Sequence, residues 1–130
     1  ASRYAVNNIV FTQMEVTPDN ASLLPKVDVV ICLSIFHHWI RKLGEEKSLV
    51  IMKGLADSTD KYLIFDTGQP NEENVEWSDC LSFMNPSVEE WAKEYFKALG
   101  FSDVVNLGSY RTSLSKVPRI LFIAVKDTSE

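Results

Sequence analysis

The sequence predicts an α/β protein with a mostly parallel sheet, flanking helices and a C-terminal antiparallel hairpin. Two near-continuous apolar runs, at residues 27–34 and 61–66, are typical of strands that are covered on both faces, as in a parallel sheet. Segments with the apolar spacing of helices occur between and after these runs. This alternation of buried strands with helices indicates the α/β class.

The first quarter of the chain is predicted to contain a strand and a loop before the first apolar run. Residues 8–14 are rich in β-branched and aromatic side chains, which favours a strand. Residues 15–26 are polar and contain two prolines, which predicts a loop with one helical turn near residues 20–24. The run at 27–34 is then the second strand.

The middle of the chain is predicted to begin with a long helix. Leu49, Met52 and Leu55 recur at three-residue spacing and predict a helix over residues 36–56. The polar cluster at 57–60 is predicted to end this helix in a turn. Three further elements follow: a strand at 61–66, a polar loop at 67–74 and a short helix at 75–84.

The last third contains the strongest helix signal of the chain, at residues 87–99. Ser87 and Glu90 have the spacing of a capping box, and Gly100 follows as a stop. One face of this helix is apolar: Val88, Trp91, Ala92, Tyr95, Phe96 and Leu99. Two strands joined by a polar turn are predicted to pair as an antiparallel hairpin, at 102–110 and 118–126.

Composition and charge restrict the class of protein. A length of 130 residues predicts one domain spanning 1–130, and 45% hydrophobic residues suffice for a core. A net charge of −5 argues against a nucleic-acid-binding or membrane-surface protein, because no basic stripe is present. Cys32, one of two cysteines, lies in an apolar run and is interpreted as a buried, reduced thiol. We expect a cytoplasmic, soluble protein, and a first residue other than Met is compatible with a piece of a longer chain.

Four segments of the sequence together carry a resemblance to a known family. Residues 27–39 read VDVVICLSIFHHW, and the other three segments lie at 45–55, 61–66 and 91–101. In one known family, the segment at 27–39 is similar to the fourth strand and the residues after it, and the segment at 45–55 to the following helix. The segment at 61–66 is similar to the fifth strand, and the segment at 91–101 to the end of a later helix. With the closing hairpin as sixth and seventh strands, the chain resembles the C-terminal two-thirds of a class I, Rossmann-like S-adenosylmethionine-dependent methyltransferase.

One part of the family's pattern is missing from the chain. The family's first strand carries a Gly-rich loop that lets backbone approach the cofactor, and its second strand ends in an acid that binds the ribose hydroxyls. The five glycines of this chain form no GxGxG arrangement: Gly44, Gly54, Gly68, Gly100 and Gly108. The resemblance therefore implies a truncated methyltransferase-like domain that lacks the main cofactor-binding part.

The resemblance implies S-adenosylmethionine as the cofactor and points to three residues that would contact it. Residues 8–14 correspond to the family's third strand, which places Glu15 where an acidic or polar residue meets the adenine. Ser34 and Ile35 lie where the fourth strand lines the methionine end of the cofactor. The alternative for Ser34 and Ile35 is ordinary packing at a strand end.

The only two histidines of the chain, His37 and His38, follow the strand at 27–34 directly. In open α/β sheets, ligands bind at the carboxyl ends of strands. The resemblance implies that His37 is a general base for a substrate hydroxyl, a role that suits an imidazole because its pKa is near neutrality. The alternative is that His37 bonds to backbone at the strand end. Two histidines without nearby carboxylates do not predict a metal site.

Further side chains are candidates for the substrate site. His38, Trp39 and Asp66 are predicted to line it, although a capping role is the favoured alternative for Asp66. Trp77 is a second candidate wall, whereas Trp91 lies on an apolar helix face and is predicted to be core. Three acidic residues are interpreted as part of a solvated loop rather than as an acid/base pair: Glu72, Glu73 and Glu76.

The missing first strand has a consequence for assembly. In the family's sheet order, its absence leaves the apolar strand at 27–34 as an open edge. An exposed apolar edge is an aggregation hazard. We therefore expect the edge to be covered, either by the N-terminal strand or by a second copy of the chain, and we predict a homodimer.

The resemblance thus implies S-adenosylmethionine-dependent methyl transfer to a small-molecule acceptor, as part of a longer or assembled enzyme. The alternative is a non-catalytic interaction or regulatory module derived from the same fold, which the missing Gly-rich loop favours. An unrelated α/β domain of the flavodoxin-like type is disfavoured by the terminal hairpin.

Overall fold

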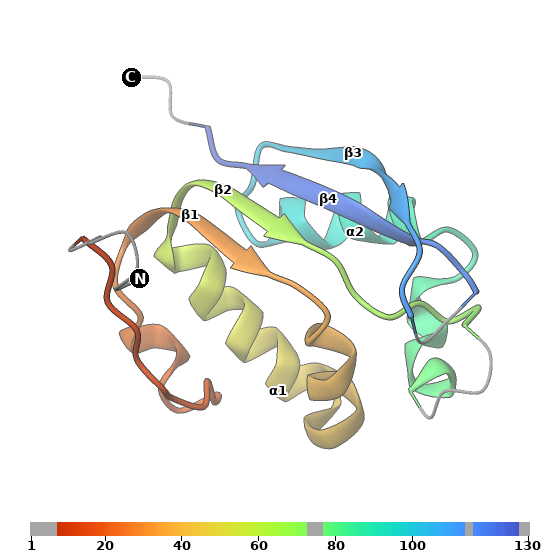
Figure 1. Cartoon of the computed structure of the whole chain (residues 1–130), viewed down its shortest axis with the longest axis horizontal. Helices are drawn as coiled ribbons and strands as arrows, with labels where there is room; N and C mark the ends of the chain where they lie inside the picture. The colour runs from red at the N-terminus through yellow and green to blue at the C-terminus, as the bar shows by residue number, and fades with distance from the viewer. Residues whose placement is uncertain (1–7, 73–76, 114–115, 128–130) are drawn as a thin grey trace.

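The molecule contains one four-stranded sheet, with its helices packed on one side (Figure 1). The computed structural model describes residues 8–72, 77–113 and 116–127. The strands pair in the order β1-β2-β4-β3, and their bounds are β1 (Val27–Cys32), β2 (Thr59–Phe65), β3 (Asp103–Tyr110) and β4 (Arg119–Val125). β1 and β2 are parallel, whereas β4 is antiparallel to both β2 and β3. The predicted α/β class with a C-terminal antiparallel hairpin is confirmed, but the four-stranded sheet is mixed rather than mostly parallel, because only the β1–β2 pair is parallel.

The helices connect these strands in the predicted order. Their bounds are η2 (Ala21–Leu23), α1 (Phe36–Ser58), η3 (Ser78–Met84) and α2 (Val88–Ala98), where η2 and η3 are 3₁₀ helices. The helical turn predicted near residues 20–24 is η2. At the start of α2, the Ser87 hydroxyl oxygen accepts a hydrogen bond from the Glu90 N–H at 3.2 Å, as an N-cap does. No helix in the described ranges is long and apolar enough to cross a membrane.

The turn predicted at residues 57–60 is wrong, because α1 continues to Ser58 and β2 begins at Thr59. The side chains of Ser58 and Thr59 make hydrogen bonds to backbone carbonyls, and the chain does not turn here. The Thr59 hydroxyl donates to the Leu55 carbonyl at 2.7 Å, and the Ser58 hydroxyl donates to the Pro25 carbonyl at 2.5 Å. The helix therefore passes directly into the strand.

Both long helices pack on the same side of the sheet (Figure 1). Alternate residues of a strand point to opposite faces, and one set of strand side chains enters the core: Cys32, Leu63, Phe65, Val104, Phe122 and Ala124. The helices contribute the facing side chains: Phe36, Ile40, Ile51, Met52, Leu55, Ala92 and Phe96. Trp91 packs against this core, as predicted.

The strand predicted at residues 8–14 is wrong. This segment is not in the sheet, and Val10 and Phe11 are 88% and 81% exposed. A sequence with high β propensity forms a strand only where a neighbouring strand offers hydrogen bonds and side-chain contacts. β1 is consequently an edge strand, and the expectation that the N-terminal segment covers this edge is also wrong.

Candidate functional site

The carboxyl ends of β1 and β2 lie side by side because the two strands are parallel and adjacent. Asp66 follows β2 and is fully buried, and its Oδ1 accepts hydrogen bonds from the Ser34 backbone N–H at 2.6 Å and from the Ser34 hydroxyl at 3.2 Å. Ser34 has a φ of +58°, in the left-handed region. Asp66 therefore holds the turn between β1 and α1, as its alternative capping role predicted.

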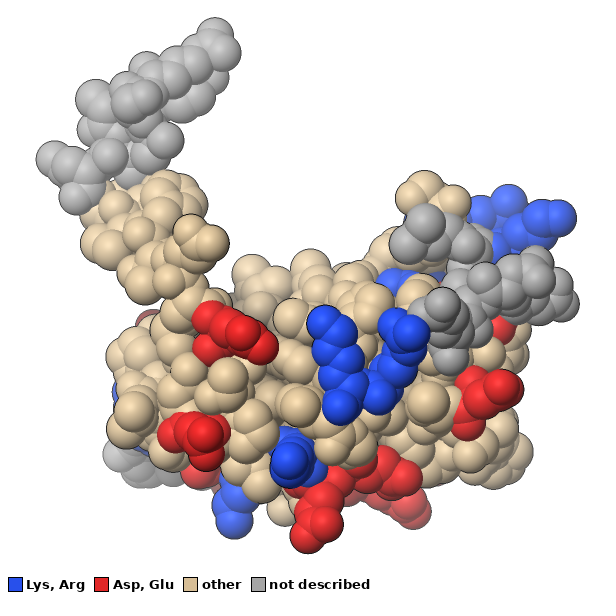
Figure 2. Space-filling view, turned by 90° about the horizontal axis from the view of Figure 1, so that it is seen from below, with Lys and Arg blue, Asp and Glu red and all other residues tan. Residues whose placement is uncertain are grey.

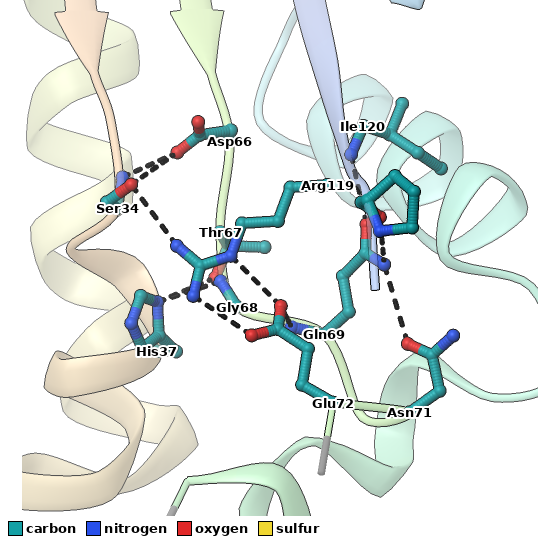
Figure 3. Close-up of polar contacts among 11 residues, drawn as sticks. Ser34, His37, Asp66, Thr67, Gly68, Gln69, Asn71, Glu72, Arg119 and Ile120 are labelled. Carbon is teal, nitrogen blue, oxygen red and sulfur yellow. Dashed lines mark hydrogen bonds and ion pairs between the residues drawn. The ribbon is translucent and has the colours of Figure 1, made fainter. Parts of the chain in front are cut away.

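A buried ion pair joins the loop after β2 to the start of β4 (Figure 3). The Arg119 guanidinium donates from Nε to Glu72 Oε2 and from Nη2 to Glu72 Oε1, each at 3.0 Å. Its Nη1 donates to the Ser34 hydroxyl oxygen at 3.3 Å. The interpretation of Glu72 as a solvated loop residue is wrong, because Glu72 is 3% exposed. Glu73 and Glu76 lie outside the described residues.

Gln69 ties the same loop to β4 (Figure 3). Its side-chain amide donates to the Pro118 carbonyl at 3.2 Å, and its Oε1 accepts from the Ile120 N–H at 3.1 Å. Its backbone N–H donates to Glu72 Oε2 at 2.9 Å. Gln69 and Arg119 were not predicted as site residues. The one signal that could have indicated Arg119 is a basic residue at the start of an apolar strand in a chain with an acidic loop.

His37 lies at the start of α1 and is buried against the loop after β2. Its Nδ1 accepts a hydrogen bond from the Gly68 N–H at 2.8 Å (Figure 3). The neutral ring therefore carries its proton on Nε2. Trp77 packs beside the His37 ring, with the ring centroids 4.4 Å apart. A side chain at Gly68 would overlap both rings, so the close approach requires glycine.

Burial keeps His37 neutral. Burial first, and then the positive charges of His38 and Arg119, lower the pKa of His37 from 6.5 to about 3. The pKa of His38 is also lowered, mainly by burial and then by the positive charge of Lys42. Burial, followed by the charge of Asp66, raises the pKa of the Cys32 thiol to about 12, so the thiol is protonated.

His37 is expected to make the stability of the protein depend on pH. Because its pKa is lower in the folded chain, the unfolded chain binds the proton more readily between pH 6.5 and about 3. The contribution of His37 to the free energy of unfolding is therefore at its full value above pH 6.5. As the pH is lowered below 6.5, the free energy of unfolding decreases by up to about 1.4 kcal/mol per pH unit. Urea unfolding at neutral and mildly acidic pH measures this slope.

A matched pair of variants separates the contribution of His37 from that of its neighbour. His37→Asn keeps an acceptor for the Gly68 N–H but removes the titration, so the slope should become shallower. His38→Asn changes a less buried ring and should leave most of the slope in place. An unchanged slope in His37→Asn would show that another group is responsible.

A pocket of about 430 Å³ lies next to this network, on the side of the N-terminal segment. Its walls come from the segment before η2 and from the first turns of α1: Glu15, Val16, Thr17, Pro18, Ile35, His38, Trp39, Lys42 and Leu43. The structure therefore brings together four predicted site residues, Glu15, Ile35, His38 and Trp39. Ser34, His37 and Asp66 are not part of this wall and belong to the adjoining network.

The charges around this end of the molecule are mixed. On the face of the molecule that Figure 2 shows, Lys and Arg side chains lie among Asp and Glu side chains and form no continuous basic stripe. Within the described residues, no group of three or more His, Cys, Asp or Glu side chains could hold a metal ion. The pocket itself contains one carboxylate, from Glu15, and one ammonium group, from Lys42.

The strand order of the sheet is shared with part of a known fold. The chain has part of the Rossmann-like fold of S-adenosylmethionine-dependent methyltransferases, as comparison with solved structures shows. No family model matches the sequence, and no curated protein matches it.

Two solved methyltransferases illustrate the likeness. The bifunctional kinase-methyltransferase WbdD is similar with a TM-score of 0.64 and 23% identity, over 82% of this chain and 22% of WbdD. Magnesium protoporphyrin IX methyltransferase (ChlM) from Synechocystis PCC 6803, with bound SAH, is similar with a TM-score of 0.63 and 20% identity. That match covers 97% of this chain and 55% of ChlM, so this chain spans only about half of the ChlM length.

Proposed function

We propose that the chain forms the C-terminal part of an S-adenosylmethionine-dependent methyltransferase for a small-molecule acceptor, within a longer or assembled enzyme. One observation carries the proposal: Glu15, Ile35, His38 and Trp39 meet in one pocket at the carboxyl end of β1. This is the end of an α/β sheet at which ligands bind. A cytoplasmic location is part of the proposal and is supported by the free thiols of Cys32 and Cys80.

The pocket fits the nucleoside end of the cofactor in chemistry and size. A volume of about 430 Å³ lies in the ordinary range for small-ligand sites, which combine apolar walls with a few polar groups. Val16 and Trp39 offer apolar and aromatic surface for a purine, and the Glu15 carboxylate offers acceptors for hydroxyl or amino groups. When bound, the cofactor supplies the methyl group as a sulfonium. No Gly-rich loop is present in the sequence to hold its methionine end.

A general-base role for His37 stays a prediction, and the described geometry limits it. The Nδ1 lone pair of His37 is engaged by the Gly68 N–H, and the neutral ring carries its proton on Nε2. The ring can accept a substrate proton only if the Gly68 hydrogen bond is released. In the described state, His37 positions the loop after β2 relative to α1.

Isothermal titration calorimetry with S-adenosylhomocysteine tests the cofactor part of the proposal. We expect micromolar binding to the wild-type chain and binding about tenfold or more weaker in Glu15→Gln, because hydrogen bonds to a charged group contribute about 1.5–3 kcal/mol. Asp19→Asn is the matched control, since Asp19 is an exposed acid of the same segment that does not line the pocket. Equal binding by all three chains would contradict the assignment of Glu15.

The second candidate function is a non-catalytic module derived from this fold. The observation that favours it is the glycine arrangement, because none of the five glycines forms the GxGxG loop that approaches the cofactor. Absence of detectable binding of both S-adenosylmethionine and S-adenosylhomocysteine to the folded chain would favour this candidate over the enzyme.

A further inference from the structure

The turn between β1 and α1 connects the buried ion pair to the pocket. Ser34 belongs to the hydrogen-bond network, whereas the next residue, Ile35, lines the pocket and is the N-cap of α1. The Ile35 carbonyl accepts hydrogen bonds from the His38 N–H at 2.9 Å and from the Trp39 N–H at 3.2 Å. Because His38 and Trp39 also line the pocket, the position of this turn sets where three of the pocket side chains lie.

The conformation of this turn depends on contacts from other parts of the chain. Ser34 has a φ of +58°, which is disfavoured for a residue with a Cβ. Ile35 has no side-chain group that could cap the helix, and α1 begins without a side-chain cap hydrogen bond. Such a backbone persists only where the surrounding structure holds it. Asp66 is one holder, since its Oδ1 accepts hydrogen bonds from the N–H and from the hydroxyl of Ser34.

Arg119 contacts the turn from the start of β4 (Figure 3). Two of its guanidinium nitrogens, Nε and Nη2, donate to Glu72, and the third, Nη1, donates to the Ser34 hydroxyl oxygen at 3.3 Å. A guanidinium is a rigid planar fork, so its two contacts with Glu72 also set the direction of Nη1. The single hydroxyl proton of Ser34 is donated to Asp66. Ser34 therefore links Arg119 to Asp66.

We propose that Arg119 is a positioning residue for the pocket beside β1, an inference that rests on the proposed function for the identity of the ligand. Held by Glu72, the guanidinium fixes the Ser34 hydroxyl, and with it the turn that carries the first residues of α1 into the pocket wall. Arg119 is 85 positions away from Ser34 in the sequence and does not line the pocket. Its effect on a bound ligand is therefore transmitted through the turn.

The Arg119→Lys variant tests the proposal. Lysine keeps the positive charge beside Glu72, but its single nitrogen cannot replace the fork that contacts both Glu72 and Ser34. In NMR spectra of the folded, ligand-free variant, we expect the N–H resonance of His38 and the indole N–H resonance of Trp39 to move. S-adenosylhomocysteine should bind about 2- to 30-fold more weakly, the range for residues that act on a site through an intervening contact.

A matched control makes the same substitution at an exposed arginine. Arg111 follows β3 and is exposed, so Arg111→Lys should leave the His38 and Trp39 resonances and the affinity unchanged. Ser34→Ala removes the hydroxyl that connects Arg119 to the turn. If Arg119 acts through this hydroxyl, adding Arg119→Lys to Ser34→Ala should cause little further change, because the effects of residues that share one contact are not additive.

The outcomes separate positioning from a purely structural role. A side chain that only stabilises the fold would lower the free energy of unfolding and leave the folded pocket as it is. Unmoved His38 and Trp39 resonances in Arg119→Lys would overturn the proposal, and so would additive effects of the two substitutions. If circular dichroism shows that Arg119→Lys is unfolded, Ser34→Ala replaces it, since it keeps the ion pair, and the same two resonances must move. A wild-type chain that binds no S-adenosylhomocysteine would contradict the proposed function, while the ligand-free resonances would still decide the role of Arg119.

Discussion

Replacing Glu72 with alanine is expected to lower the free energy of unfolding by about 3–5 kcal/mol. The substitution leaves the Arg119 guanidinium buried without its carboxylate, since Arg119 is only 3% exposed. It also removes the acceptor of the Gln69 backbone N–H. A buried charge that has lost its carboxylate carries a desolvation cost, which the remaining hydrogen bond from Arg119 to Ser34 offsets only in part. Urea unfolding at neutral pH measures the loss.

Two comparisons show whether the ion pair itself is responsible. Lys93→Ala removes a solvent-exposed ion pair with Glu89 at 3.4 Å and should change stability little, because exposed pairs are screened by water. The double variant Glu72→Leu with Arg119→Met removes both charges and should be more stable than Glu72→Ala. A loss in Glu72→Ala as small as that in Lys93→Ala would mean that Arg119 is solvated in solution.

Gly54→Ala is expected to destabilise the protein by about 1–3 kcal/mol and to weaken cofactor binding at the same time. A methyl group at Gly54 would lie 2.6 Å from the Ala21 Cβ and 2.7 Å from the Ala21 carbonyl carbon and oxygen. The carbonyl carbon and oxygen are backbone atoms of η2, and the Cβ of an alanine has no rotamer to change, so the clash cannot be relieved by turning a side chain. η2 would have to move away from α1, and with it the segment that supplies Glu15 to the pocket.

Thermal unfolding and titration with S-adenosylhomocysteine measure the two effects together. Lys53→Ala is the control, because Lys53 is the exposed neighbour of Gly54 on α1 and should leave stability and binding nearly unchanged. A Gly54→Ala chain with wild-type stability and binding would show that η2 does not pack against α1 in solution.

The elements that were predicted correctly have local signals. The apolar run of β1, the spacing of apolar residues in α1 and the Ser87 cap of α2 each lie within a few consecutive residues. Periodicity and capping chemistry act over this range, so they can be read from the sequence. The resemblance selected Glu15, Ile35, His38 and Trp39 from segments that are distant in the chain, and these four residues line one pocket, while their binding roles stay predictions.

The predictions that failed concern residues whose structure depends on contacts with residues far away in the sequence. Residues 8–14 have the composition of a strand, but no described strand pairs with them. Glu72 has the local context of a solvated loop residue, yet it is buried by an arginine 47 positions later in the chain. Neither local propensity nor periodicity contains information about a contact between residues so far apart in the chain. The buried ion pair between Glu72 and Arg119 was therefore not predicted.

Titration of the ¹⁵N-labelled chain with S-adenosylhomocysteine, followed by NMR, tests the central claim most directly, because it locates the bound molecule. We expect the largest shift changes at Glu15, Ile35 and His38, and at the indole N–H of Trp39, which all line the pocket beside β1. The apolar hollow between α1 and α2, lined by Phe83, Trp91 and Tyr95 among others, should be unaffected. Shift changes confined to that hollow, or a spectrum that does not change at all, would contradict a cofactor site at the carboxyl end of β1.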